Sequence, residues 1–219
     1  LGVVYYHMGN NYEKSEFFYL EAKAIKERTI GKEQIDYTTT LTGLGDIYYF
    51  TGNIELAENY YREALKIREK ILGKEDILYG ECLRKMGNVS AAKGQYEEAA
   101  RYYRETITEK RIGKENTTYA VAIMNLGGVY LGIKKYPEAE LYFLEVKRIL
   151  EGISNYTEHP YYMTCNAALG ILYYETGQFE LSENYHLIAK DLRGRMLGKE
   201  HLSYQMSLAF LADLYWKMG

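Results

Sequence analysis

Catalytic or metal chemistry in this sequence would have to come from few side chains, because it holds only four histidines and two cysteines. Zinc sites use such residues at close spacings, as in His-Glu-x-x-His or Cys-x-x-Cys. Neither pattern occurs, since these residues stand far apart: His7, His159, His186, His201, Cys82 and Cys165. The carboxylates are plentiful but form no isolated acid-base pair. We therefore expect no metal, no cofactor and no enzymatic activity.

Glycines that bind phosphate are closely spaced and are followed by Lys and Ser or Thr. Here the glycines recur at long intervals, and Gly127-Gly128 is a doublet inside a predicted helix. Small residues in such a place allow close packing or the approach of a ligand's backbone. The glycines are therefore interpreted as structural.

Binding is the chemistry that the remaining side chains favour. One set is large and mostly aromatic, and consists of Tyr6, Tyr49, Leu131, Tyr174 and Trp216. A second set is polar, with Arg84, Asn88 and Asn125. Buried aromatic and arginine side chains supply most of the binding energy at many protein interfaces. The members of the first set stand four residues after a recurring glycine, or after Ala212 in the last copy. Among the polar residues, Arg84 stands three before such a glycine, Asn88 one after it and Asn125 two before it, so the elements that carry these positions decide what the residues can contact.

That glycine belongs to a sequence motif that is repeated along the whole chain. The clearest copy contains Tyr37, Leu41, Leu44, Gly45, Tyr48, Gly52 and Ala57. The equivalent glycines of the next copies are Gly87, Gly127 and Gly170, at intervals of 42, 40 and 43 residues. A period of this length is typical of stacked helical repeats. The repeats are predicted at 1–34 (incomplete at its start), 35–76, 77–116, 117–159, 160–201 and 202–219 (first helix only).

Each copy is predicted to be a pair of helices. Leu41, Leu44 and Tyr48 recur at three and four residues, as on one face of a helix. The same spacing resumes after Gly52, so a second helix should pack on the first, with small residues where the backbones approach. His186 takes the position of Tyr61, Tyr103 and Phe143 in this second helix and is interpreted as a packing residue. Gly-Lys-Glu begins the link after the second helix at Gly31, Gly73, Gly113 and Gly198, whereas residues 151–159 are irregular and Pro160 should begin a helix.

This motif resembles the tetratricopeptide repeat family, and the period near 42 with His159-Pro160-Tyr161-Tyr162 is similar to its kinesin light-chain subtype. The resemblance implies an all-α fold, a right-handed α-α superhelix in which residues 1–219 form a single solenoid. It also implies that the first helices line a groove. We call groove face the positions six and three before the repeat glycine and one, four or five after it.

By this definition the groove face carries the aromatic set together with Arg84 and Asn88, whereas Lys85 and Asn125, two before their repeat glycines, lie beside it. Tyr6, Tyr49, Leu131, Tyr174 and Trp216 form an aromatic and apolar row, and Arg84, Lys85, Asn88 and Asn125 form a polar patch. Family members that clamp a partner's terminal carboxylate use basic residues in a third repeat, where this chain has Thr164 and Ala168. The full clamp is therefore disfavoured, and the aromatic-acidic cargo preference of kinesin light-chain relatives is not carried over.

The charge and the hydropathy of the chain argue against two kinds of partner, nucleic acids and membranes. The net charge is -3 and the basic residues are scattered, so nucleic-acid binding has no electrostatic support. The longest nearly apolar run, residues 119–133, is shorter than the roughly 20 residues that span a membrane. Cys82 and Cys165 lie in equivalent positions of non-adjacent repeats, which indicates packing residues and a reducing, cytoplasmic location. The chain opens inside a repeat, so we expect it to be a piece of a longer protein.

The sequence leaves three functions open. The first is a scaffold that binds a partner protein or peptide in the groove. The second is a regulatory or sensor region of a larger enzyme, such as a protease or a nucleotide-hydrolysing switch. The third is self-association through the terminal helices, where Phe210, Leu214 and Trp216 have no following repeat to cover them.

Overall fold

The structure, a computed structural model, describes residues 11–107, 117–153 and 155–219. It divides into two compact units, Leu1–Ile112 and Gly113–Gly219. Each unit is described by itself below. Within the described ranges the chain is helical and contains no strand, which confirms the predicted all-α class.

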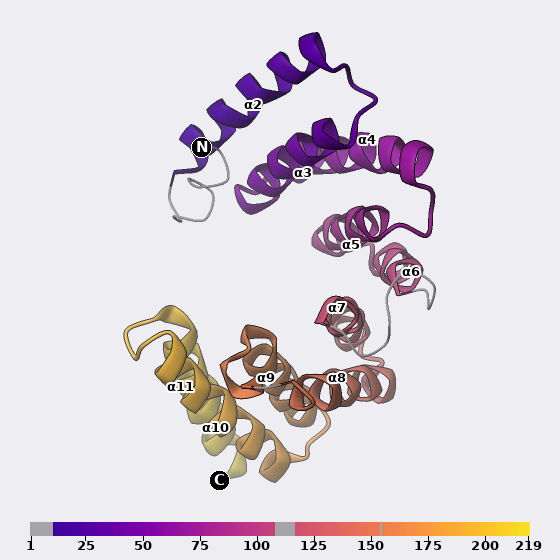
Figure 1. Cartoon of the computed structure of the whole chain (residues 1–219). Coiled ribbons are helices and arrows are strands. Elements are labelled where there is room, and N and C mark those ends of the chain that lie inside the picture. Colours follow the sequence, from indigo (N-terminus) through magenta and orange to yellow (C-terminus); the bar gives the residue numbers. More distant parts are fainter. Residues whose placement is uncertain (1–10, 108–116, 154) are drawn as a thin grey trace. The chain divides into compact units, whose positions relative to one another are not determined.

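Antiparallel helix pairs build both units (Figure 1). The first unit contains α2 (Tyr12–Thr29), α3 (Ile35–Phe50), α4 (Ile54–Leu72), α5 (Ile77–Ala92) and α6 (Tyr96–Thr106). The second contains α7 (Thr117–Gly132), α8 (Tyr136–Glu151), the 3-10 helix η1 (Tyr156–Glu158), α9 (Pro160–Glu175), α10 (Phe179–Met196) and α11 (Leu202–Met218). The hairpin partners are α3 with α4, α5 with α6, α7 with α8, and α9 with α10. This is the predicted pairing of a first and a second helix in each repeat.

A residue in the left-handed backbone conformation follows the first helix of each hairpin. Seven residues after the repeat glycine, Gly52, Gly94 and Gly177 have φ of +84°, +74° and +76°. The third copy has Lys134 at this position, and Lys134 adopts the same conformation with φ of +59°. The conformation is therefore imposed by the hairpin, because a residue with a Cβ atom accepts it at a cost.

The central packing contact of every described hairpin is an aromatic ring on the repeat glycine. A Cβ atom on Gly45 would lie 2.4 Å from the Tyr61 ring, and one on Gly87 would lie 2.5 Å from the Tyr103 ring. The same clash distance is 2.7 Å for Gly127 with Phe143 and 2.8 Å for Gly170 with His186. Real Cβ atoms do not approach other atoms so closely, so only glycine allows the two helices their spacing. The predicted close approach of the two backbones is confirmed.

The second helix of one repeat is tied to the next repeat by a cation. In three cases the cation donates to a backbone carbonyl ten residues later: Lys26 Nζ to Asp36 O (2.7 Å), Arg68 Nη1 to Leu78 O (2.7 Å) and Arg193 Nη1 to Ser203 O (3.2 Å). Leu150 holds the equivalent position in α8 and is fully buried. The link that follows Leu150 is the irregular one, as predicted, and α9 begins at Pro160.

Tyrosine hydroxyls add a second tie between repeats. The residue three after the repeat glycine, or after Ala212 in the last copy, donates to a glutamate of the preceding second helix: Tyr48 to Glu16 (2.5 Å), Tyr173 to Glu140 (2.5 Å) and Tyr215 to Glu183. Two of these rings also stack on a tyrosine of their own hairpin, Tyr48 on Tyr60 and Tyr173 on Tyr185. The many tyrosines of the sequence therefore serve packing and hydrogen bonding at once.

His186 is the exception among the packing rings. It is 1% exposed, stacks on Phe210 at 5.1 Å, and both of its ring nitrogens lack a hydrogen-bond partner within the described residues. Burial, assisted by the charge of Arg193, lowers the pKa of His186 to about 4. The imidazole is thus held neutral in the fold, as expected of a packing residue.

Substitution of Gly127 by alanine should destabilise the fold, and substitution of its neighbour Gly128 should stabilise it. At Gly127 the added methyl meets the buried Phe143 ring, and overpacking of this kind costs about 1–3 kcal/mol. At Gly128 nothing lies within 4 Å, so alanine contributes its helix propensity of up to about 1 kcal/mol. Thermal unfolding of the two variants measures this difference. Equal shifts in Tm would contradict the ring contact.

Acid should weaken the fold through His186. The unfolded chain binds this proton near pH 6.5 and the folded chain only near pH 4, so the free energy of unfolding falls as the pH drops between these values. The loss is at most about 3 kcal/mol. His186→Phe copies the Gly127–Phe143 contact and should remove this part of the pH dependence in urea unfolding between pH 7 and pH 4. An unchanged pH profile in the variant would refute it.

Candidate functional site

The predicted groove residues of the first unit gather around one hydroxyl group, that of Tyr103. Asn88 Oδ1 accepts a hydrogen bond from Tyr103 Oη at 2.7 Å. Burial raises the pKa of Tyr103, the nearby Tyr49 raises it further, and the positive charge of Arg84 opposes the shift. Tyr49, Arg84 and Asn88 therefore belong to one cluster, which joins α3, α5 and α6.

Arg84 is the cation of this cluster that remains available. It is half-buried, and within the described ranges the structure gives it no hydrogen bond or ion pair of its own. Lys85, which the sequence placed in the same polar patch, is instead paired with Asp46 and lies over the Tyr61 ring at 5.4 Å. Lys85 is thus paired inside the fold, whereas Arg84 has no ion pair among the described residues.

The type of residue directly after the repeat glycine corresponds to the aromatic ring that packs on that glycine: it is polar where the ring carries a hydroxyl group. Asp46 Oδ1 accepts from Tyr61 Oη at 2.6 Å, as Asn88 does from Tyr103. Where the ring is Phe143, which has no hydroxyl, this position is Gly128. Where the ring is His186 it is Ile171, which leaves the imidazole without a polar neighbour on this side. The sequence analysis did not predict Asp46 and Tyr103 as site residues. The constant spacing between the residue after the repeat glycine and the packing ring could have indicated them.

In the second unit, Tyr174 is held by side chains of α11, which is the first helix of the last, incomplete repeat. Tyr174 Oη donates to Asp213 Oδ2 at 2.6 Å, and Lys217 Nζ lies 4.3 Å from the centre of the Tyr174 ring. Asp213 and Lys217, which the sequence did not single out, are one and five positions after Ala212 in α11. Tyr174 is therefore half-buried and fixed in place, whereas Trp216 is 83% exposed.

A pocket lies on the groove face of α11. It has a volume of about 340 Å³ and is lined by Met206, Ala209, Phe210 and Asp213. Three of these residues are groove-face positions, and Asp213 is the acceptor of the Tyr174 hydroxyl. The pocket is mostly apolar, because the carboxylate is its only charged lining group. It suits an apolar side chain of a ligand.

The other predicted site residues are more dispersed. Leu131 is half-buried near the end of α7, and Asn125 is half-buried in the same helix. Tyr6 lies outside the described residues. Of the three side chains expected to lack cover in the last helix, Leu214 is buried, since α11 turns it towards α10, and only Phe210 and Trp216 are exposed.

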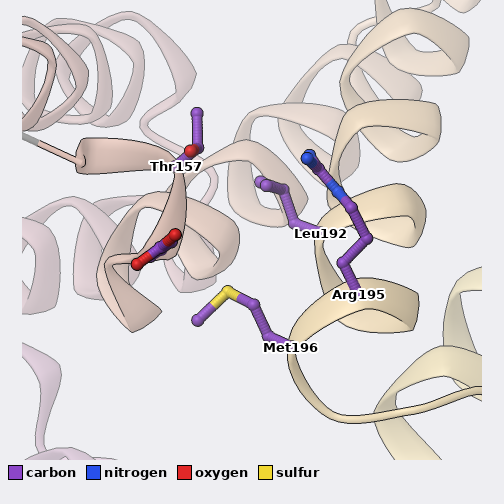
Figure 2. Close-up of a pocket in the computed structure, with 5 residues that line it drawn as sticks. Thr157, Leu192, Arg195 and Met196 are labelled. Atoms are coloured by element: carbon purple, nitrogen blue, oxygen red, sulfur yellow. The ribbon is translucent and has the colours of Figure 1, made fainter.

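A second pocket lies at the irregular link, away from the groove face (Figure 2). It has a volume of about 390 Å³ and is lined by Thr157, Glu158, Leu192, Arg195 and Met196. Figure 2 shows Leu192 and Met196 extending from α10 towards the 3-10 helix. Arg195 is paired with Asp191 at 3.0 Å. The lining joins the apolar side chains of Leu192 and Met196 to the hydroxyl of Thr157, the carboxylate of Glu158 and the guanidinium of Arg195.

Neither cysteine is placed for catalysis. Both are free and buried, and burial raises the pKa of Cys82 to about 11 and that of Cys165 to about 12. The reactive form of cysteine is the thiolate, which these values suppress at neutral pH. Within the described ranges no cluster of histidine, cysteine or acidic side chains could hold a metal ion. Among the same residues, no helix is long and apolar enough to cross a membrane.

Known proteins resemble the chain in its repeat and its fold. Residues 1–70 and 52–108 match the sequence profile of the tetratricopeptide repeat. The BtubC (BKLC) protein of P. vanneervenii has a similar structure, with a TM-score of 0.72 and 18% identity over 94% of this chain and 84% of that one. No curated protein sequence matches the chain.

Two further solved structures have the same fold. A putative kinesin light chain of Podospora anserina with nearly identical repeats has a TM-score of 0.70 and 18% identity, over 88% of this chain and 91% of that one. The apo form of RapI has a TM-score of 0.72 and 17% identity, over 97% of this chain and 81% of that one. At these identities the likeness shows the fold alone.

The two thiols should react with 5,5′-dithiobis(2-nitrobenzoate) only after unfolding. Their burial and raised pKa values suppress the thiolate in the folded chain. The absorbance of the released thionitrobenzoate at pH 7.5 should therefore remain near zero without denaturant and reach two equivalents in concentrated urea. Rapid release of one equivalent from the folded chain would reveal a reactive cysteine.

Proposed function

Because this chain belongs to the tetratricopeptide repeat family, we propose that its groove face binds a partner protein or peptide and that the chain has no catalytic activity of its own. The chain is a helical repeat of the kind that serves protein interaction. The observation that carries the groove proposal is the cluster around Tyr103, where Arg84 retains a positive charge without an ion pair within the described residues.

The groove face of each unit, taken by itself, offers different groups to a partner. The first offers the guanidinium of Arg84 beside the Asn88–Tyr103 hydrogen bond, which suits an acidic or amide-rich part of a partner. The second offers the exposed Trp216 and the apolar pocket on α11. Aromatic anchors and arginines dominate the energetics of many interfaces, so each unit by itself offers a group suited to contact with a partner. The two buried free thiols suit a cytoplasmic location, where cysteines stay reduced.

Arg84→Glu combined with Trp216→Ala should abolish partner capture without loss of helicity. Among the described residues Arg84 is paired with no carboxylate, and Trp216 is 83% exposed, so neither change should unfold the chain. Reversal of one charge and loss of one aromatic anchor should weaken binding by roughly a hundredfold or more. The measurement is affinity capture from the native lysate followed by mass spectrometry, with circular dichroism to confirm the fold.

The matched control is Lys66→Glu combined with Leu141→Ala. Lys66 is an exposed cation of a second helix, and Leu141 is 67% exposed on another. These changes have the same chemistry but lie away from the groove face, so the captured partners should be retained. Loss of the partners in the control, or their retention in the groove variant, would count against the groove.

A further inference from the structure

The irregular link between α8 and α9 forms one wall of a pocket against α10. In place of the Gly-Lys-Glu sequence of the other links it contains the 3-10 helix η1, which contacts α8, α9 and α10. The Tyr156 ring meets the Tyr162 ring edge to face at 4.9 Å, and the Tyr162 hydroxyl donates to Glu151 at 3.0 Å. These contacts hold η1 in place and thereby position its two other residues, Thr157 and Glu158.

The pocket, with a volume of about 390 Å³, has a polar wall and a mostly apolar wall. Thr157 and Glu158 supply a hydroxyl and a carboxylate from η1. Leu192 and Met196 supply apolar surface from α10, and both extend towards the 3-10 helix (Figure 2). Arg195 completes the lining from α10. None of these five residues is a groove-face position, so the pocket is separate from the proposed groove site.

The two charged side chains of the lining differ in what they already contact. Arg195 Nη2 lies 3.0 Å from Asp191 Oδ2, so the guanidinium has a counter-charge on its own helix. The side chains of Thr157 and Glu158 have no hydrogen bond or ion pair within the described part of the chain. An anion in the pocket would compete with Asp191 and lie near the carboxylate of Glu158. A cation would gain that carboxylate as a partner without breaking an existing pair.

The apolar wall sets a requirement on the body of the ligand. Leu192 is 3% exposed and Met196 is half-buried, so the surface that they offer is already packed into the fold. An unbranched aliphatic stem can lie along such a surface while its charged end stays in contact with water. Lysine and arginine side chains combine such a stem with a cation. A purely apolar side chain would leave Glu158 unmatched.

We propose that this pocket binds a lysine or arginine side chain of a partner protein. The aliphatic stem lies on Leu192 and Met196, and the cationic group donates to Glu158 and Thr157. The net charge of -3 on the chain favours the approach of a basic segment. The pocket is thus a second contact site of defined chemistry, and it does not depend on binding at the groove face.

NMR spectroscopy of the whole chain, labelled with ¹³C at its methionine methyl groups, reports on Met196 directly. The titrants are N-acetyl-lysine N-methylamide, the norleucine analogue, which keeps the stem without the charge, and the glutamate analogue. The Met196 signal, identified by its loss in Met196→Leu, should shift with the lysine compound until it saturates. The Kd of the lysine compound should be roughly threefold or more below that of the norleucine compound, as expected for an ion pair at an exposed carboxylate. The glutamate compound should leave the signal in place.

Two glutamate variants assign the cation contact. Glu158→Gln keeps the size of the side chain and should remove the advantage of lysine over norleucine. The matched control is Glu180→Gln, which changes an exposed carboxylate in the first turn of the same helix α10 and should retain this advantage. Both side chains are exposed, so both variants should keep the original Tm.

The outcomes decide the proposal in either direction. Tighter binding of lysine than of norleucine, lost in Glu158→Gln and kept in Glu180→Gln, supports it. Equal Kd values for the lysine and norleucine compounds on the unmodified chain overturn it, as does tighter binding of the glutamate compound or the absence of any shift. Titration with n-butylamine separates a protein side chain from a free amine. Tighter binding of n-butylamine than of the lysine compound would assign the pocket to small amines and overturn the proposal.

Discussion

The contact of an aromatic ring with the repeat glycine is the constraint on which the other features of each hairpin depend. It sets the distance between first and second helix at Gly45, Gly87, Gly127 and Gly170. Because a ring fills the space that a Cβ atom would need, the helix surface on either side of the glycine is fixed in register. The groove-face residue that follows the glycine is placed by the same contact.

This placement couples the core to the proposed binding surface. Asp46 and Asn88 lie on the groove face, yet each accepts the hydroxyl of the ring packed beneath its own glycine. A tyrosine in the core therefore requires a polar residue on the surface, and Phe143 releases that requirement at Gly128. Whether the residue directly after the repeat glycine is polar follows in part from the identity of the buried ring.

Periodicity made much of the fold predictable. The spacing of glycines and leucines predicts the helical hairpins, and the equivalence of His186 with Tyr61 predicts its burial. Pairings between distant side chains could not be predicted, because they depend on the register between helices. The salt bridge that neutralises Lys85 and the hydrogen bond from Tyr174 to Asp213 are of this kind. The groove-face residues remain predictions as ligand contacts.

Site-specific photocrosslinking tests the central claim, that partners bind the groove face, most directly. Benzoylphenylalanine is placed at Ala91 in α5, a half-buried groove-face position, and separately at Lys66, exposed on the second helix α4. Irradiation in the presence of a captured partner, followed by mass spectrometry, identifies the joined residues. The account predicts efficient crosslinking from position 91 and little from position 66. Crosslinking from position 66 alone would contradict it.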